Sequence, residues 1–394
     1  MPRCRAWMMA AFLALLAPGA GWAGDEVRVP VILPLTGLGA FLGQGEREAL
    51  EIMQGVVNRQ GGIGGRMLRF QMMDDRSVPQ DSVQLMTGLM PERPAVVLGS
   101  AIAGSCGATA PLLRQGPVQY CFSPAVHPPP GSFMFTAGVS SGDTYRVVMR
   151  YFRLRGFTRI GFLASTDATG QDGERAVEAA LKLPENAAMR LAGRQSFNPA
   201  DLSVAAQLET IRAASPEALM VATSGTPLGT VLKGLVQAGM DLPTSTLYSN
   251  MTFAQMEAYA AFLPSALYFP SGQWPRGGKE SDAAVAAAKQ EFYGAYQALG
   301  RVPDVGATLA WDPALIVVAA LRAAGPAADA ATLRATIAGM AAFPGLNGRY
   351  DFRRNPQRGL DESDVVIARW DKARHEFAVV SAPTGLPLPP TPPP

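Results

Sequence analysis

The sequence predicts an α/β protein built from two parallel sheets that are flanked by helices. Short β-branched apolar runs alternate with longer amphipathic stretches from Val27 onward, and this alternation is typical of parallel strands connected by helices. The chain has 394 residues, which is enough for two such sheets. Hydrophobic residues make up 48% and charged residues 17%. After the first two dozen positions no run approaches the roughly 18 apolar residues of a membrane span, which excludes a polytopic membrane protein.

The individual elements follow from spacing and from turn residues. Residues 27–35 are expected to form a strand, and residues 46–58 a helix, because Ala49, Leu50 and Met53 recur at helical spacing. The glycines of residues 61–65 end this helix, since they tolerate positive φ. Further strands are expected at residues 67–73, 95–98, 118–122, 133–136, 160–164, 219–222, 246–248 and 267–269, and further helices at 143–154, 173–183, 202–213, 227–238, 280–299 and 314–324. Three short strands are expected at residues 349–352, 365–370 and 377–380.

The N-terminus carries a targeting pattern. Arg3 and Arg5 precede an apolar run of about a dozen residues, which ends in Pro-Gly before a small-residue site. This is typical of a cleaved secretory signal peptide over residues 1–23. Cys4 precedes the apolar run, so a lipoprotein anchor is not predicted. We therefore expect a periplasmic protein that is not inserted in the membrane after signal cleavage.

Charge and residue counts exclude several classes of function. The chain has 34 basic and 32 acidic residues, and removal of Arg3 and Arg5 with the signal leaves 32 of each. This balance argues against nucleic-acid binding, which needs a surplus of cations. Only two histidines, His127 and His375, and three cysteines are present, so no metal site is expected.

Two cysteines remain after signal removal, Cys106 and Cys121. A bridge between them would close a loop of about 15 residues and stabilise the fold by about 3 kcal/mol in the chain-entropy model. The sequence does not fix their separation in space, so it leaves the bridge open.

The sequence argues against two kinds of enzyme. Gly37, Gly39 and Gly43 lie between a strand and a helix, but their spacing does not match the G-x-G-x-x-G dinucleotide motif, and the first acid after that helix, Asp74, comes too late. Ser224 precedes a glycine but lies in no G-x-S-x-G elbow. We therefore expect no cofactor and no catalysis.

A family resemblance rests on an ordered set of short motifs, of which none is decisive alone. They are VILPLTG at residues 31–37, NRQGGIGGR at 58–66, DDRSVP at 74–79, LGS at 98–100, SPA at 123–125, TDATGQ at 166–171, NMT at 250–252 and GLNG at 345–348. Taken together, over residues 27 to about 380, the chain resembles the leucine/isoleucine/valine-binding family, the extracytoplasmic substrate-binding proteins of ABC importers.

The resemblance implies the type I periplasmic binding protein fold, in which two Rossmann-like lobes are joined by three crossovers and the ligand lies in the cleft between them. It places the crossovers near Ala137, Pro270 and Pro344. The expected N-terminal lobe comprises residues 24–137 and 271–344, the C-terminal lobe residues 138–270 and 345–381, and residues 382–394 form a Pro-rich disordered tail.

The expected site lies where loops follow the carboxyl ends of the strands, because ligands of open α/β sheets bind there. The loops of both lobes should line the cleft. The candidate ligand-binding residues are Phe41, Leu42, Ser100, Ala101, Ile102, Ala103, Ser123, Ala125, His127, Thr169, Ser224, Gly225 and Asn250.

Several of these residues have a second interpretation. Either Phe41 or Leu42 could face the cleft, and His127 could be a surface turn residue before three prolines. Thr169 stands where many relatives have tyrosine. Relatives that bind amino acids place an acid near Asn250, whose amide cannot pair with an ammonium group, although Asn250 could also form an Asx-turn.

The functional expectation is a substrate-binding protein that acts as a monomer and delivers a small organic solute to an inner-membrane ABC permease. A carboxylate, aromatic acid or amide is favoured over the family default, a branched-chain amino acid, because the acid near Asn250 is missing. The alternative is a ligand-sensing periplasmic module that reports to a separate signalling partner. The sequence names neither the ligand nor the permease.

Overall fold

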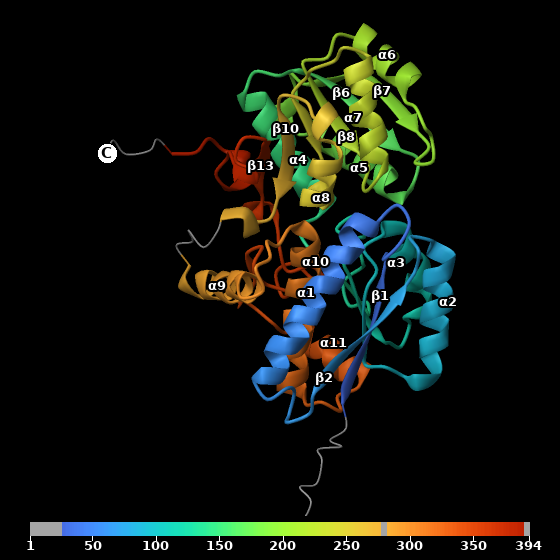
Figure 1. The fold of residues 1–394 in the computed structure, drawn as a ribbon, viewed down its shortest axis with the longest axis vertical. Coiled ribbons are helices and arrows are strands. Elements are labelled where there is room, and N and C mark those ends of the chain that lie inside the picture. The colour runs from blue at the N-terminus through green and yellow to red at the C-terminus, as the bar shows by residue number, and fades with distance from the viewer. Residues whose placement is uncertain (1–25, 277–281, 390–394) are drawn as a thin grey trace, which may run out of the picture.

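The computed structural model describes residues 26–276 and 282–389 and shows two α/β lobes, stacked one above the other (Figure 1). The first lobe contains a parallel five-stranded sheet with the strand order β2-β1-β3-β4-β5. Its strands are β1 (Val27–Leu33), β2 (Leu68–Asp74), β3 (Val96–Gly99), β4 (Val118–Cys121) and β5 (Met134–Thr136). The apolar, β-branched β1 lies inside this sheet, where both faces are covered.

Helices cover both faces of the first sheet (Figure 1). On one face α1 packs against α10, and on the other α2 packs against α3. The helices of this lobe are α1 (Ala40–Arg59), α2 (Pro79–Leu89), α3 (Ala103–Thr109), α9 (Ala283–Gln297), α10 (Val305–Ala324) and α11 (Ala330–Ala338).

The second lobe contains a seven-stranded sheet with the order β14-β13-β10-β9-β8-β6-β7. Its parallel strands are β6 (Arg159–Ser165), β7 (Arg190–Phe197), β8 (Ala218–Ala222), β9 (Thr244–Thr246) and β10 (Leu267–Ser271), and the antiparallel strands β13 (Val366–Asp371) and β14 (Glu376–Val379) extend one edge. The helices are α4 (Ser141–Leu154), α5 (Ala168–Leu181), α6 (Ala205–Ala213), α7 (Pro227–Gln237) and α8 (Phe253–Ala258). The mixed α/β class with mostly parallel sheets is the predicted one.

The chain passes between the sheets after β5, after β10 and before β13. We expected the last passage near Pro344, but the chain stays against the first sheet for longer. The Phe352 ring packs edge-on against Phe135 with centroids 5.7 Å apart, and the Thr136 amide donates to the carbonyl of Gln357 at 2.9 Å. The short pair β11 (Phe343–Pro344) and β12 (Arg349–Tyr350) precedes this segment, whose aromatic side chains complete the first core.

Several helices begin earlier than their apolar spacing predicts, among them α5, which begins at Ala168, five residues before its expected start. Helix α1 begins at Ala40, six residues before the expected start, and α10 begins at Val305 because the Asp304 side chain accepts a hydrogen bond from the Gly306 amide. Pro313 lies inside α10. No elements were expected at α2, β7 and α11, whose apolar patterns are short or interrupted by polar residues.

One described helix, α10, is long and apolar enough to cross a membrane by length and composition, but 83% of its apolar window is buried inside the protein. It is therefore a core helix, packed against α1. The expected signal peptide lies in residues 1–25, outside the described part. Residues 382–386 belong to the expected tail, yet they form a turn in which the Thr384 amide donates to Val365 and its carbonyl accepts from Arg150.

Candidate ligand-binding cavity

A cavity lies between the lobes, at the carboxyl ends of the parallel strands of both sheets. Its volume is about 40 Å³, and because both lobes contribute to its walls, a ligand enters and leaves when the lobes part. The lining residues are Leu42, Ala101, Ile102, Ser123, Pro124, Ala125 and Leu309 from the first lobe, and Ser141, Thr144, Tyr145, Thr169, Asp172, Gly173, Ser224, Leu247, Tyr248, Ser249 and Pro270 from the second.

The first-lobe wall is built from the start of α1 and the loops after β3 and β4. Helix α1 reaches the cavity because Gly43 has no side chain: a Cβ there would lie 2.2 Å from the carbonyl oxygen of Pro34. This contact places Leu42 against the cavity and gives the glycine-rich stretch after β1 a packing role. Ala101 and Ile102, just before α3, complete an apolar surface.

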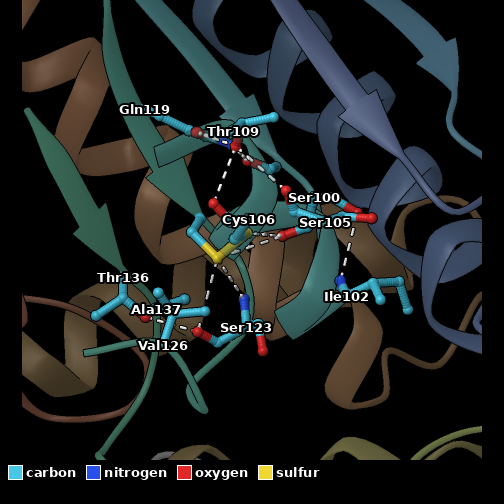
Figure 2. The surroundings of a disulfide bond; sticks show 12 residues. Ser100, Ile102, Ser105, Cys106, Thr109, Gln119, Ser123, Val126, Thr136 and Ala137 are labelled. Carbon is cyan, nitrogen blue, oxygen red and sulfur yellow. Dashed lines mark hydrogen bonds between the residues drawn. A yellow bond between two sulfur atoms is a disulfide. The ribbon is translucent and has the colours of Figure 1, made fainter. Parts of the chain in front are cut away.

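A disulfide holds two parts of this wall together (Figure 2). Cys106 of α3 is bonded to Cys121 of β4, with the two Cα atoms 6.1 Å apart, and both side chains are fully buried. The Cys121 sulfur accepts a hydrogen bond from the amide of Ser123, which lines the cavity. The bridge that the sequence left open is therefore present, and it connects the middle of α3 to the end of β4.

The second-lobe wall is built from the N-terminal turns of α4 and α5. Ser140 caps α4 by accepting from the Asp143 amide, and Asp167 caps α5 by accepting from the Gly170 amide. These caps fix the first turns, which carry Ser141 and Thr169 to the cavity. Burial raises the pKa of Tyr145, so this lining phenol is neutral.

Asp172 is the only acidic or basic side chain among the lining residues of the described chain, and the sequence analysis did not select it. It is 3% exposed and lies three residues after Thr169 on α5. Its carboxylate accepts hydrogen bonds from Ser141, His127 and Arg175. Burial alone would raise its pKa, but these hydrogen bonds and the nearby His127 and Arg175 charges keep the pKa below its ordinary value. Helical spacing from Thr169 was the signal that could have identified this residue.

Asn250 does not line the cavity, so the predicted contact of its amide with the ligand stays a prediction that this cavity does not support. The side chain is fully buried, and it donates to the carbonyl of Thr223 and the hydroxyl of Thr246. It accepts from the amides of Gly225 and Gln255. The expected Asx-turn is also absent at this residue, since Thr252 caps α8 instead. Asn250 therefore ties the loops after β8 and β9 together from behind.

The other predicted residues divide into two groups. Leu42, Ala101, Ile102, Ser123, Ala125, Thr169 and Ser224 come together around the cavity, whereas Phe41, Ser100, Ala103, His127, Gly225 and Asn250 lie outside its lining. Phe41 packs edge-on against Tyr259 of the second lobe, with ring centroids 6.3 Å apart. Ser100 is buried, and its hydroxyl accepts from the amide of Ile102.

Gly225 forms a close contact between the lobes at one rim of the cleft. The Thr226 amide donates to the carbonyl of Leu38 at 3.2 Å, and a Cβ on Gly225 would lie 2.1 Å from that same oxygen. The φ of Gly225 is +81°, which also favours glycine. The lobes therefore meet backbone to backbone here, on the side of the cleft that α1 lines.

The polar groups of the cavity suit a small ligand better than a metal. The hydroxyls of Ser123 and Thr169 line the cavity and make no hydrogen bond within the described residues, so both are available to a ligand. In the same described ranges, no group of three or more His, Cys, Asp or Glu side chains is arranged to hold a metal ion.

The two lobes and the cavity between them define the class of two-lobed ligand-binding proteins. The chain belongs to the periplasmic binding protein family, whose model matches residues 26–375. No curated protein sequence matches it significantly.

Solved structures share the fold at low sequence identity. An extracellular ligand-binding receptor from Rhodopseudomonas palustris HaA2 is 20% identical, with 90% of this chain and 99% of that chain covered and a TM-score of 0.81. The substrate-binding protein of a branched-chain amino acid transporter from Streptococcus pneumoniae, in complex with isoleucine, is 17% identical (90% and 99% covered, TM-score 0.74). An ABC transporter solute-binding protein from R. palustris, in complex with benzoate, is 18% identical (92% and 97% covered, TM-score 0.75).

Proposed function

We propose that this protein captures a small organic solute between its lobes and delivers it to an inner-membrane ABC permease. The observation that carries the proposal is the cavity formed by strand-end loops of both lobes, with direct contacts between the lobes at its rims. The family implies a periplasmic location. Capture by closure fits this geometry, because a ligand that touches both walls favours the closed form over the open one.

The cavity favours binding over covalent catalysis. Ser141, His127 and Asp172 lie together, but the Ser141 hydroxyl donates directly to Asp172, and the same His127 Nε2 atom approaches both. A catalytic triad needs the serine and the acid on opposite nitrogens of the imidazole. This group therefore cannot relay a proton from Ser141 through His127 to Asp172 in this arrangement.

We further propose that the ligand is a small, largely apolar acid or amide without an ammonium group. Asn250 no longer supports this preference. Asp172 bears on the ammonium group only, and its negative charge opposes an anionic ligand as well, which favours the neutral amide within this class. Its carboxylate already accepts from Ser141, His127 and Arg175, so an ammonium group would have to compete with them. The hydroxyls of Ser123 and Thr169 can donate to a carboxylate or a carbonyl, and the apolar first-lobe wall fits a hydrocarbon body.

The test compares ligands with and without an ammonium group. Leucine and its 2-oxo analogue, 4-methyl-2-oxopentanoate, share a side chain, and benzoate and benzamide add the aromatic classes. Thermal-shift and calorimetric titration should show stabilisation by an acid or amide, since a ligand at 100 times its dissociation constant stabilises the fold by about 2.7 kcal/mol. Tighter binding of leucine than of its 2-oxo analogue would contradict the proposed ligand class.

A further inference from the structure

One of the two histidines joins the lobes across the cleft. His127 lies in the loop after β4 of the first lobe, and its Nε2 atom is 2.9 Å from Asp172 Oδ1 on α5 and 3.2 Å from the Ser141 hydroxyl on α4. Both partners belong to the second lobe. This contact can therefore exist only while the lobes are closed at this rim.

The exposure of the three side chains suits a contact that opens and closes. The Asp172 and Ser141 side chains are buried in the second-lobe wall, whereas the His127 side chain is 48% exposed. His127 can leave with its loop when the lobes part. Asp172 then keeps Ser141 and Arg175, which lie in its own lobe.

We propose that His127 is a positioning residue that holds the lobes closed in a proton-dependent way, so that closure of the ligand cavity weakens as the pH rises. The inference rests on the proposed capture between two lobes and adds a regulation of that same site. The imidazolium form carries a positive charge to the Asp172 carboxylate, and the neutral form does not.

The direction of the effect follows from proton linkage. Ser141 donates its own hydrogen to Asp172 Oδ2, so Nε2 is the donor in its two contacts. Either the neutral ring with its hydrogen on Nε2 or the imidazolium supplies that hydrogen, and only the imidazolium adds a positive charge to the contact. Histidine ordinarily changes charge between pH 5 and 8. Since the closed form pairs the imidazolium with a carboxylate, the closed form binds more protons than the open form. The closed fraction should therefore fall as the pH rises through this interval.

The charges around His127 limit the size of the effect. Asp172 is the one carboxylate in contact with the ring among the described residues. Four arginines from different elements lie near His127. Arg175 of α5 pairs with Asp172, and Arg358 donates to the carbonyls of Pro124 and Val126. Arg114 and Arg334 line a surface cavity that His127 also lines. On α4, Asp143 is paired with Arg146. Because the ring is half exposed, we expect a change of about two- to fivefold in the closed-to-open ratio.

The experiment measures the distance between the lobes without any ligand. Nitroxide labels at Q84C on α2 and A206C on α6 occupy exposed positions in different lobes (Figure 1). Pulsed electron paramagnetic resonance on the labelled protein at pH 5.5 and pH 8 then gives the populations of short and long distances. We expect the ratio of the short-distance to the long-distance population to be about two- to fivefold higher at pH 5.5 than at pH 8.

The second histidine supplies a matched control. His375 packs against Trp370 and lies 3.4 Å from Glu257, so all of these contacts are within the second lobe. The H127Q and D172N variants should abolish the pH dependence, and H375Q should retain it. Three results would overturn the proposal. H127Q could keep the wild-type change of distance with pH, H375Q could lose that change, or the wild type could show the same distance distribution at both pH values.

The outcomes also separate this inference from the proposed function. In one outcome the best-stabilising compound shortens the distance between the lobes at constant pH, but the distance in the protein without that compound does not change with pH. This result would overturn the role of His127 alone. Failure of both ligand and pH to change the distance would overturn the capture mechanism as well.

Discussion

The two walls of the cavity are built in different ways. The first-lobe wall is apolar apart from Ser123, has no acidic or basic side chain among its described lining residues, and is held by the Cys106–Cys121 bridge between α3 and β4. The second-lobe wall carries Asp172 and most of the lining hydroxyls, and it is held by helix caps and by the buried amide of Asn250. The difference indicates a fixed apolar surface in one lobe and polar recognition in the other.

Removal of the disulfide should have the largest effect on stability. The C106A/C121A double variant loses the closure of a loop of about 15 residues, so its free energy of unfolding should fall by about 3 kcal/mol. Urea denaturation of this variant and of the wild type measures the difference. A change below about 0.5 kcal/mol, the range of an ordinary surface substitution, would mean that the bridge does not hold the first wall.

Asn250→Ala tests the corresponding support of the second wall. The substitution leaves the amide of Gly225 and the carbonyl of Thr223 without their buried partner, so we expect a loss of about 2 kcal/mol in unfolding free energy. N198A, at an exposed loop position, is the control. If N250A instead kept full stability and lost only ligand binding, Asn250 would be a ligand contact after all.

Gly225→Ala should weaken ligand binding at least about tenfold, which corresponds to roughly 1.4 kcal/mol. Its Cβ would clash with the Leu38 carbonyl only when the lobes close. Gly239→Ala is the matched control, because Gly239 also has positive φ, at +63°, but has open space around its Cβ position. Calorimetric titration of both variants with the best-stabilising compound compares them. Equal affinities would show that this rim is not closed in the bound form.

Asp172→Asn should have the smallest effect, a loss of about 1 kcal/mol for replacing a charged acceptor. The folded-state pKa of Asp172 is lowered, so its contribution is present above the ordinary aspartate value of about 3.9 and is lost as the pH falls below it. Denaturation of wild type and D172N at pH 6 and pH 3 should therefore show a smaller difference at pH 3. A difference that grows in acid would contradict this assignment.

The sequence predicted the α/β class well because strands and long helices depend on local spacing. The side chains of the loops were harder to place from the sequence, since their directions depend on contacts between distant segments. Seven selected residues do surround the cavity, yet Asn250 faces away from it, towards Thr223 and Thr246. The sequence does not indicate Asp172, because its position opposite His127 depends on how the two lobes meet.

Capture by closure is tested most directly by small-angle X-ray scattering of the protein alone and saturated with the most stabilising compound of the panel. The contacts at both rims predict a smaller radius of gyration in the saturated protein, because the lobes spend more time together. An unchanged radius of gyration, with binding verified by calorimetry in the same buffer, would contradict closure of the lobes around the ligand.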